Sequence, residues 1–186
     1  MDRVTTDSWI AKPSDSEIEV LFEKYGAPRL RDIVENVSLT KFNRARRNLP
    51  YKGHVILITI RKSGDLVFIR ETGTEEWAVP HGTIYQNETV EDAVFREAQE
   101  ETGLTVGIRD LVSLDRTRLF CGHNAMELWI FIFIVDEKKG ILNPTDKVEI
   151  IEIKSCKYIP KKLDRYMIIH EIPSILVSLG YNPTIP

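Results

Sequence analysis

The stretch from residue 90 to residue 102 (VEDAVFREAQEET) constrains the fold more than any other part of the sequence. Thr89 in front of it is a favoured helix N-cap, and Asp92 stands three residues on as the partner for a capping box. Gly103 behind it is the residue type that commonly ends a helix. These signals predict a helix over residues 90–102. The chain must therefore fold so that one face of this helix packs against other elements.

Three glutamates fall on the apolar face of the predicted helix. Successive residues turn by about 100° around a helix axis. On this spacing Glu97, Glu100 and Glu101 share a side with the small and apolar residues of the helix, which are Val90, Ala93, Val94 and Ala98. A solvated acidic helix would instead continue its charges along the polar face. Turning uncompensated carboxylates toward a core costs several kcal/mol each, and the three would also repel one another.

A divalent metal ion is the simplest compensation for these carboxylates. Among residues 88–101 six are acidic and only Arg96 is basic, and on the helical wheel Arg96 points away from the glutamates. Carboxylate oxygens suit Mg²⁺ or Mn²⁺ better than Zn²⁺. A metal held in this way keeps positions for phosphate oxygens, so the pattern predicts a phosphate-binding metal site.

The spacing around the helix resembles the Nudix box, the signature of the Nudix hydrolases. The box runs from Gly82 to Leu104, and its fixed positions here are Gly82, Glu88, Arg96, Glu97, Glu100, Glu101 and Gly103. The resemblance covers about residues 50–180 and implies the family's α/β/α sandwich, an α/β (α+β) fold with a mixed β-sheet between helices. Residues 1–50 lie outside it and are predicted to form an N-terminal helical extension, which leaves residues 51–186 as the Nudix hydrolase domain.

The resemblance also implies a reaction and a set of residues that carry it. The reaction is hydrolysis of a phosphoric anhydride bond in a nucleoside diphosphate linked to another moiety, with Mg²⁺ or Mn²⁺ activating the attacking water. Glu97, Glu100 and Glu101 would bind the metal and act in catalysis. Glu88 and Arg96 would brace these ligands and hold the loop against the helix. A non-catalytic module that senses a nucleotide or an ADP-ribose-type ligand is the alternative, and a purely structural domain is a third interpretation.

The general base is not fixed by the box. In the family it is either a box glutamate or an acid from a later loop, so Glu101, Glu149 and Glu152 are the candidates. Glu149 and Glu152 lie in the segment KVEIIEIK. Both are explained equally well as charges on the exposed face of an edge strand.

His81 marks a departure from the family pattern. Many members carry Pro-Gly-Gly at the start of the box, where this chain has Pro80-His81-Gly82. A main-chain carbonyl in this turn is often a metal ligand in the family, so the resemblance implies a metal contact at His81. Its imidazole would then lie beside the phosphates. A tolerated loop histidine is the alternative.

Residues that would bind the rest of a substrate are less clearly marked. Phe120, Tyr85 and Trp129 are candidates for stacking on a base, and core packing is the alternative for each. Arg47 lies in the basic segment KFNRARRNLPYKGH, which could supply arginines for a diphosphate. A solvated basic surface or a homodimer contact is the other interpretation of that segment.

Other elements follow from periodicity. Residues 16–25 and 29–37 show two short helical patterns on either side of a Gly-Ala-Pro sequence. The segments GHVILITIRK and DLVFIRE predict a β-hairpin. Two long strands joined at residues 121–124, another strand within residues 147–159, and a closing helix over residues 161–180 that Pro173 interrupts complete the expected order.

Composition limits the partners. With 42% hydrophobic residues, 28% charged residues and a formal charge of −3, the chain has no bulk attraction for nucleic acid. The longest apolar run, residues 128–135, is far shorter than the roughly 20 residues that a membrane span needs. We therefore expect a cytoplasmic location, reduced cysteines, no membrane, no specific nucleic acid, and a small-molecule nucleoside diphosphate derivative as the partner.

Overall fold

The computed structural model describes residues 8–47 and 50–183 of the chain. Within these ranges the fold is mixed α+β, as the sequence predicted. Contacts along the chain divide it into two compact units. The first unit is drawn from Met1–Val55, Thr83–Ala93 and Leu111–Ile132, and the second from Ile56–Gly82, Val94–Asp110 and Phe133–Pro186.

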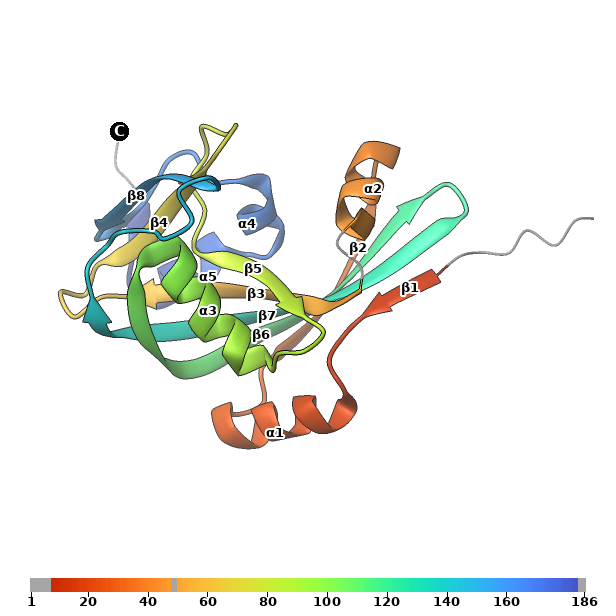
Figure 1. Cartoon of the computed structure of the whole chain (residues 1–186), viewed down its shortest axis with the longest axis horizontal. Helices are drawn as coiled ribbons and strands as arrows, with labels where there is room; N and C mark the ends of the chain where they lie inside the picture. The colour runs from red at the N-terminus through yellow and green to blue at the C-terminus, as the bar shows by residue number, and fades with distance from the viewer. Residues whose placement is uncertain (1–7, 48–49, 184–186) are drawn as a thin grey trace, which may run out of the picture. The chain divides into compact units, whose positions relative to one another are not determined.

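Eight strands form one mixed sheet, counted over the residues that the structure describes. Their hydrogen-bonded order is β2-β6-β7-β3-β4-β8, with β1 paired to β7 and β5 paired to β3 (Figure 1). The bounds are β1 Ser8–Ala11, β2 Arg29–Asn36, β3 Tyr51–Ile60, β4 Leu66–Glu71, β5 His81–Tyr85, β6 Leu104–Cys121, β7 Asn124–Gly140 and β8 Ile150–Cys156. A separate two-stranded sheet joins β9 Tyr158–Ile159 to β10 Asn182–Pro183 in parallel.

The helices are α1 Asp15–Tyr25, α2 Leu39–Arg47, α3 Val90–Thr102, α4 Arg165–Ile169 and α5 Ile172–Ser178. The predicted hairpin is confirmed, because β3 and β4 pair in antiparallel fashion. The two long strands are confirmed as β6 and β7. The closing helix is divided into α4 and α5, and Pro173 lies in the first turn of α5, where its missing N–H costs nothing.

The prediction of a helix over residues 29–37 is wrong, because residues 29–36 form β2. Leu30, Ile33 and Val34 have helical spacing, yet the whole of β2 pairs in parallel register with Ser113–Phe120 of β6. Arg31 Nη1 also donates a hydrogen bond to the buried carboxylate of Asp115 at 3.0 Å. Strand pairing and this ion pair therefore override the local pattern.

A hydrophobic cluster holds the first unit together. Phe42 of α2 is only 1% exposed and packs in a cluster with Tyr51, Leu119 and Met126. The ring of Trp9 meets that of Phe42 edge-on, with centroids 6.0 Å apart. Side chains from the N-terminal 50 residues and from β3, β6 and β7 thus share one core.

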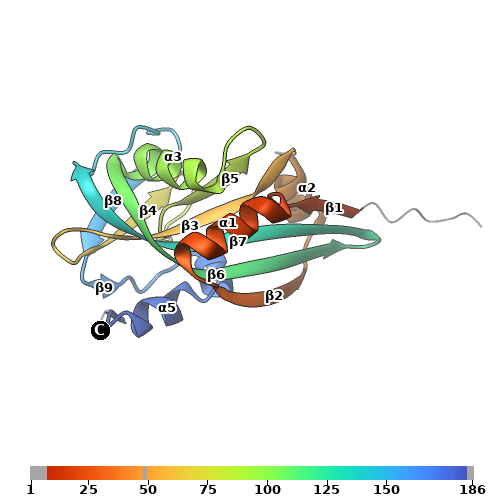
Figure 2. The same cartoon turned by 90° about the horizontal axis from the view of Figure 1, so that it is seen from below.

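The second unit is layered. From Val94 onward α3 lies on one face of the strands, and α5 lies on the opposite face (Figure 2). β4 and β8 lie side by side in antiparallel register, with Phe68 opposite Lys154 and Arg70 opposite Glu152 (Figure 1). The predicted sandwich of helices around a mixed sheet is confirmed.

Helix α3 begins and ends where the sequence predicted. Thr89 and Asp92 form a reciprocal capping box, in which each side chain accepts the backbone N–H of the other residue at 3.1 Å. Gly103 follows the helix with φ +76°, a left-handed conformation that favours glycine. Its N–H donates to the carbonyl of Gln99 at 3.0 Å. These local signals fix the position of every carboxylate on the helix.

The described residues also include both cysteines and the helices that could bear on a membrane span. Cys121 and Cys156 are both free thiols. Among the helices of residues 8–47 and 50–183, none has the length and apolar character needed to cross a membrane.

Candidate active site

Acidic side chains from β4, α3 and the segment before β8 gather in the second unit. Glu71 ends β4, His81 begins β5 and Glu101 lies in the last turn of α3. One ligand atom from each of these three residues lies within 4.8 Å of the others. The two carboxylates and the imidazole are the kind of donors that bind a metal ion.

Glu101 is the most deeply buried acid of this group, with 4% of its surface exposed. Its Oε2 accepts a hydrogen bond from the backbone N–H of His81 at 2.7 Å. Burial raises the pKa of Glu101 well above its usual range, and the negative charge of Glu97 raises it further. A cation beside Glu101 would favour its ionised form.

Glu97 lies one turn earlier on α3 and is 7% exposed. Burial raises its pKa to about 7, although the guanidinium of Arg96 opposes this shift. Arg96 Nη1 donates a hydrogen bond to Glu97 Oε1 at 2.7 Å. A Cβ atom placed on Gly82 would overlap the Glu97 carboxylate, so any other residue at position 82 requires this carboxylate to move.

Glu100 differs from the other two glutamates of the box. Its side chain is 45% exposed, and it accepts a hydrogen bond from Arg96 Nη1 at 2.9 Å. The helical wheel therefore placed Glu97 and Glu101 correctly on the buried face, but Glu100 lies at its margin. Arg96, which the wheel pointed away, reaches back along its flexible stem to hold Glu97 and Glu100 together.

His81 pairs with Glu71, an acid that the sequence analysis did not select. His81 Nε2 lies 3.1 Å from Glu71 Oε1, and His81 Nδ1 donates to the carbonyl of Val79 at 3.0 Å. In the neutral imidazole this leaves a lone pair on Nε2, the atom that faces the carboxylates. The ring of Tyr166 on α4 lies against His81 with centroids 5.7 Å apart, so the imidazole is held from both sides.

Glu149 and Glu152, the two later candidates for the general base, have different surroundings. The exposed Glu149 is close enough that its charge contributes to the raised pKa of both Glu97 and Glu101. Glu152 forms an ion pair with Arg70, its partner in the β4–β8 register. Glu149 thus lies near the box glutamates, whereas Glu152 is paired with Arg70.

The donor set fits a divalent cation. The carboxylates of Glu97 and Glu101 both have a raised pKa. The neighbouring Arg96 already forms ion pairs with two glutamates, Glu97 and Glu100. Such a group gains most from a charge of +2 held by oxygen ligands. Glu97, Glu100 and Glu101, with Glu71 and the imidazole of His81, are the residues that could hold it.

Other predicted site residues belong to the first unit and are not members of this cluster. Glu88 Oε1 accepts the backbone N–H of Tyr85 at 2.8 Å, which fastens the loop that leads into α3. Tyr85 is 53% exposed, as a stacking residue would need to be. Trp129 Nε1 donates to Glu127 at 2.8 Å.

Phe120 and Arg47 are also placed in the first unit. Phe120 is half-buried in β6, and its carbonyl accepts the N–H of Val37 at 2.9 Å. Arg47 is exposed at the end of α2. Their part in substrate binding stays a prediction.

The family follows from a comparison with known sequences. The profile of the NUDIX domain matches residues 50–163, which is more than half of the chain. The chain belongs to the NUDIX family.

Similar curated proteins carry a more specific name. The chain is 41% identical over 54 residues to the RNA pyrophosphohydrolase of Marinomonas sp. (strain MWYL1), a match that covers 29% of the chain and 34% of that protein. It is 27% identical over 114 residues to the RNA pyrophosphohydrolase of Hahella chejuensis, covering 53% of the chain and 71% of that protein. A third such enzyme, from Hydrogenovibrio crunogenus, is matched over 40% of its length.

Solved structures share the fold. A UDP-X diphosphatase aligns with a TM-score of 0.53 at 16% identity, covering 92% of the chain and 76% of that structure. A NUDIX hydrolase from Nitrosomonas europaea aligns with a TM-score of 0.50 at 18% identity, covering 72% of the chain and 76% of that structure. At this level of identity the likeness supports the architecture alone.

Proposed function

We propose that this protein is a divalent-cation-dependent hydrolase of phosphoric anhydride bonds in nucleoside diphosphate derivatives. The observation that carries the proposal is the pair of buried carboxylates Glu97 and Glu101. They lie on the same well-capped helix, and the negative charge of Glu97 raises the pKa of Glu101. Such a pair does not stabilise the fold, because the free-energy cost of removing two carboxylates from water exceeds the gain from their interactions inside the protein. A bound cation accounts for both.

We assign Glu97, Glu100 and Glu101 as the metal ligands, with Glu71 and His81 available to complete the set. When bound, Mg²⁺ or Mn²⁺ would supply positive charge to the diphosphate oxygens and lower the pKa of a bound water. The chain itself fixes the donors in advance. Arg96 holds Glu97 and Glu100, the N–H of His81 holds Glu101, and Gly82 leaves room for the Glu97 carboxylate.

We assign Glu149 as the residue that accepts the proton of the attacking water. Its carboxylate is exposed, so a proton taken up in the site can pass to solvent, and its charge reaches both buried glutamates. Glu149→Gln should lower kcat about 100-fold and remove the acidic limb of the pH–rate profile. Glu152→Gln is the matched control on the next strand. Equal loss in both variants, or no loss in Glu149→Gln, would contradict the assignment.

The substrate class has two candidates. A nucleotide, nucleotide sugar or related diphosphate fits the small donor set and the modest net charge of −3. The names of the similar curated proteins, which are RNA pyrophosphohydrolases, favour RNA that carries a phosphoric anhydride bond as the second candidate. Helix α2 of the first unit carries three arginines in its last turn, Arg44, Arg46 and Arg47. Basic side chains on a helix are suited to RNA phosphates.

One panel of reactions separates these candidates. Release of phosphate, pyrophosphate or nucleotide would be measured on nucleoside triphosphates, nucleotide sugars, dinucleoside polyphosphates, ADP-ribose and a 5′-triphosphorylated oligoribonucleotide. Each substrate is tested with Mg²⁺, with Mn²⁺ and with EDTA. We expect turnover that depends on the metal. Tight binding of one compound without turnover would instead identify a ligand-sensing module, and turnover in EDTA would refute the metal-dependent mechanism.

Two further expectations extend this proposal. We expect the protein to act in the cytoplasm, which fractionation of cells can test. We also expect a homodimer, and light scattering of the purified protein gives its mass directly. A monomer at all concentrations would contradict the second expectation.

A further inference from the structure

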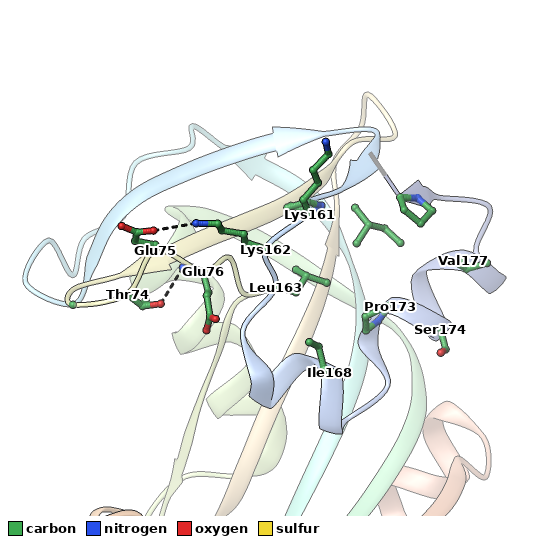
Figure 3. Close-up of a pocket in the computed structure, with 14 residues that line it drawn as sticks. Thr74, Glu75, Glu76, Lys161, Lys162, Leu163, Ile168, Pro173, Ser174 and Val177 are labelled. Carbon is green, nitrogen blue, oxygen red and sulfur yellow. Dashed lines mark hydrogen bonds and ion pairs between the residues drawn. The ribbon is translucent and has the colours of Figure 1, made fainter. Parts of the chain in front are cut away.

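A large open cavity lies in the second unit between the loop after β4, strand β9 and helices α4 and α5 (Figure 3). Its volume is about 1050 Å³. Cavities of roughly 300–1,000 Å³ are the size that binds small organic ligands. None of the box glutamates lines it, so it is separate from the carboxylate cluster.

The walls of this cavity are mainly apolar. Ile159 and Leu163 form a buried part of the wall, with 3% and 9% of their surfaces exposed. Ile168 and Val177 line it while remaining 56% and 50% exposed. Two large aliphatic side chains left in water beside one cavity favour an apolar ligand that would cover them.

A smaller basic pocket adjoins the cavity. It measures about 290 Å³ and shares three lining residues with the large cavity, which are Pro160, Lys161 and Lys162. Its remaining lining is Trp77, Lys154 and Tyr158. Three lysines and two aromatic residues therefore surround a pocket to which no acidic side chain contributes.

Strong ion pairs do not occupy the lysines of the basic pocket, although burial lowers the pKa of Lys154. Lys161 is exposed on the wall that the two pockets share. Lys162 lies 3.1 Å from Glu75, but their side chains are 68% and 84% exposed, and such a pair contributes little energy. Lys154 Nζ stands 3.7 Å over the ring of Trp77. The nearby acid Glu152 is engaged by Arg70.

We propose that these joined pockets bind an amphiphilic anion, with its alkyl chain in the large cavity and its anionic head among Lys154, Lys161 and Lys162. The apolar walls match the chain, and the three ammonium groups match a phosphate or carboxylate. The acids of the large cavity, Glu75 and Glu76, come from the loop after β4, and an anionic head would compete with Glu75 for the exposed Lys162. The site extends beyond the proposed hydrolysis, because a phosphate monoester or a carboxylate has no anhydride bond to cleave.

Isothermal titration calorimetry of the full chain in EDTA tests the proposal. The probes are octyl phosphate, decyl phosphate and decanoate below their micelle concentrations, with inorganic phosphate and octanol as half-ligands. We expect saturable binding at one site for the amphiphiles and at least tenfold weaker binding of each half-ligand. Each added methylene should tighten binding about fourfold. Tighter binding of decyl phosphate would identify a phosphorylated lipid as the source, and tighter binding of decanoate a fatty acid.

Matched variants locate the site. Lys161→Ala should weaken binding of octyl phosphate about tenfold, whereas Lys157→Ala, an exposed lysine outside both pockets, should leave it unchanged. Ile168→Glu should abolish binding. Its control is Ile151→Glu, because Ile151 is 54% exposed and lines neither pocket.

Three results would overturn the proposal. The first is no saturable binding of any amphiphile. The second is binding of inorganic phosphate or octanol as tight as that of octyl phosphate. The third is equal affinity in Ile168→Glu and Ile151→Glu when circular dichroism shows both folded. None of these results bears on hydrolysis, so the two proposals fail independently.

Discussion

Burial changes the chemistry of two glutamates that would be ordinary acids in water. Glu97 and Glu101 were predictable from the sequence, because helical spacing placed them beside Val90, Val94 and Ala98. Glu71 was not predictable. It lies 26 residues before Glu97 in the sequence, and only the folding of β4 brings it to His81.

At the same scale, Glu101→Gln should lower metal-dependent turnover by on the order of 100-fold or more. The change removes the negative charge from the most buried donor while keeping its shape and its bond to the His81 N–H. Steady-state kinetics with Mg²⁺ gives the result. Glu23→Gln, an exposed change of the same kind on α1, is the control. Near-normal activity of Glu101→Gln would refute the ligand assignment.

A second residue-scale prediction concerns pH. The folded pKa of Glu97 is about 7, above its value in an unfolded chain. The folded state therefore binds more protons, and the unfolding free energy of the metal-free protein should fall as pH rises from about 4.5 to 7. The fall due to Glu97 is on the order of 3 kcal/mol.

Urea unfolding at a series of pH values in EDTA measures this effect. Glu97→Gln cannot titrate, so its stability should decline less over the same range, and Mg²⁺ should reduce the decline of the unchanged protein. Identical pH dependence in the two proteins would contradict the raised pKa.

Elements with strong local signals were predictable from the sequence. Strand β2 was not, because its conformation depends on pairing with a distant strand. The capping box and Gly103 set the ends of α3, and the turn between β3 and β4 set the hairpin. Residues 29–37 carry a helical pattern, but their pairing with β6 is a contact between segments about 84 residues apart. No local pattern contains that information.

The capping box gives an element-scale prediction. Thr89→Ala removes the side-chain oxygen that accepts the Asp92 N–H at 3.1 Å, and should lower the unfolding free energy by about 1 kcal/mol. Thr105→Ala in β6 is an exposed control with the same change of side chain. Denaturant unfolding compares the two. A loss no larger than that of the control would mean that the cap does not support α3.

At the scale of the whole molecule, the boundary drawn at residue 50 stays a prediction. The first unit takes Phe42 from before this boundary and packs it in one cluster with Leu119 and Met126 from well after it. A segment that merely extends a finished domain would not supply one of its largest fully buried side chains.

Phe42→Ala tests this point. We expect a loss of about 3–5 kcal/mol in unfolding free energy, because the ring leaves a cavity in the shared core. Phe95→Ala, at a side chain that is 44% exposed, should cost far less. Thermal and urea unfolding give both values. If Phe42→Ala costs no more than its control, the first 50 residues are an appendage after all.

Gly82 is a position where we expect little tolerance of mutation. Every amino acid other than glycine carries a Cβ atom, and that atom would overlap the carboxylate of Glu97. Any missense change in codon 82 therefore displaces a proposed metal ligand, however small the new side chain. Glu100, with its half-exposed side chain, sits in no such tight space. In a library that places every amino acid at each position and is selected for activity, glycine should therefore be strongly enriched at position 82.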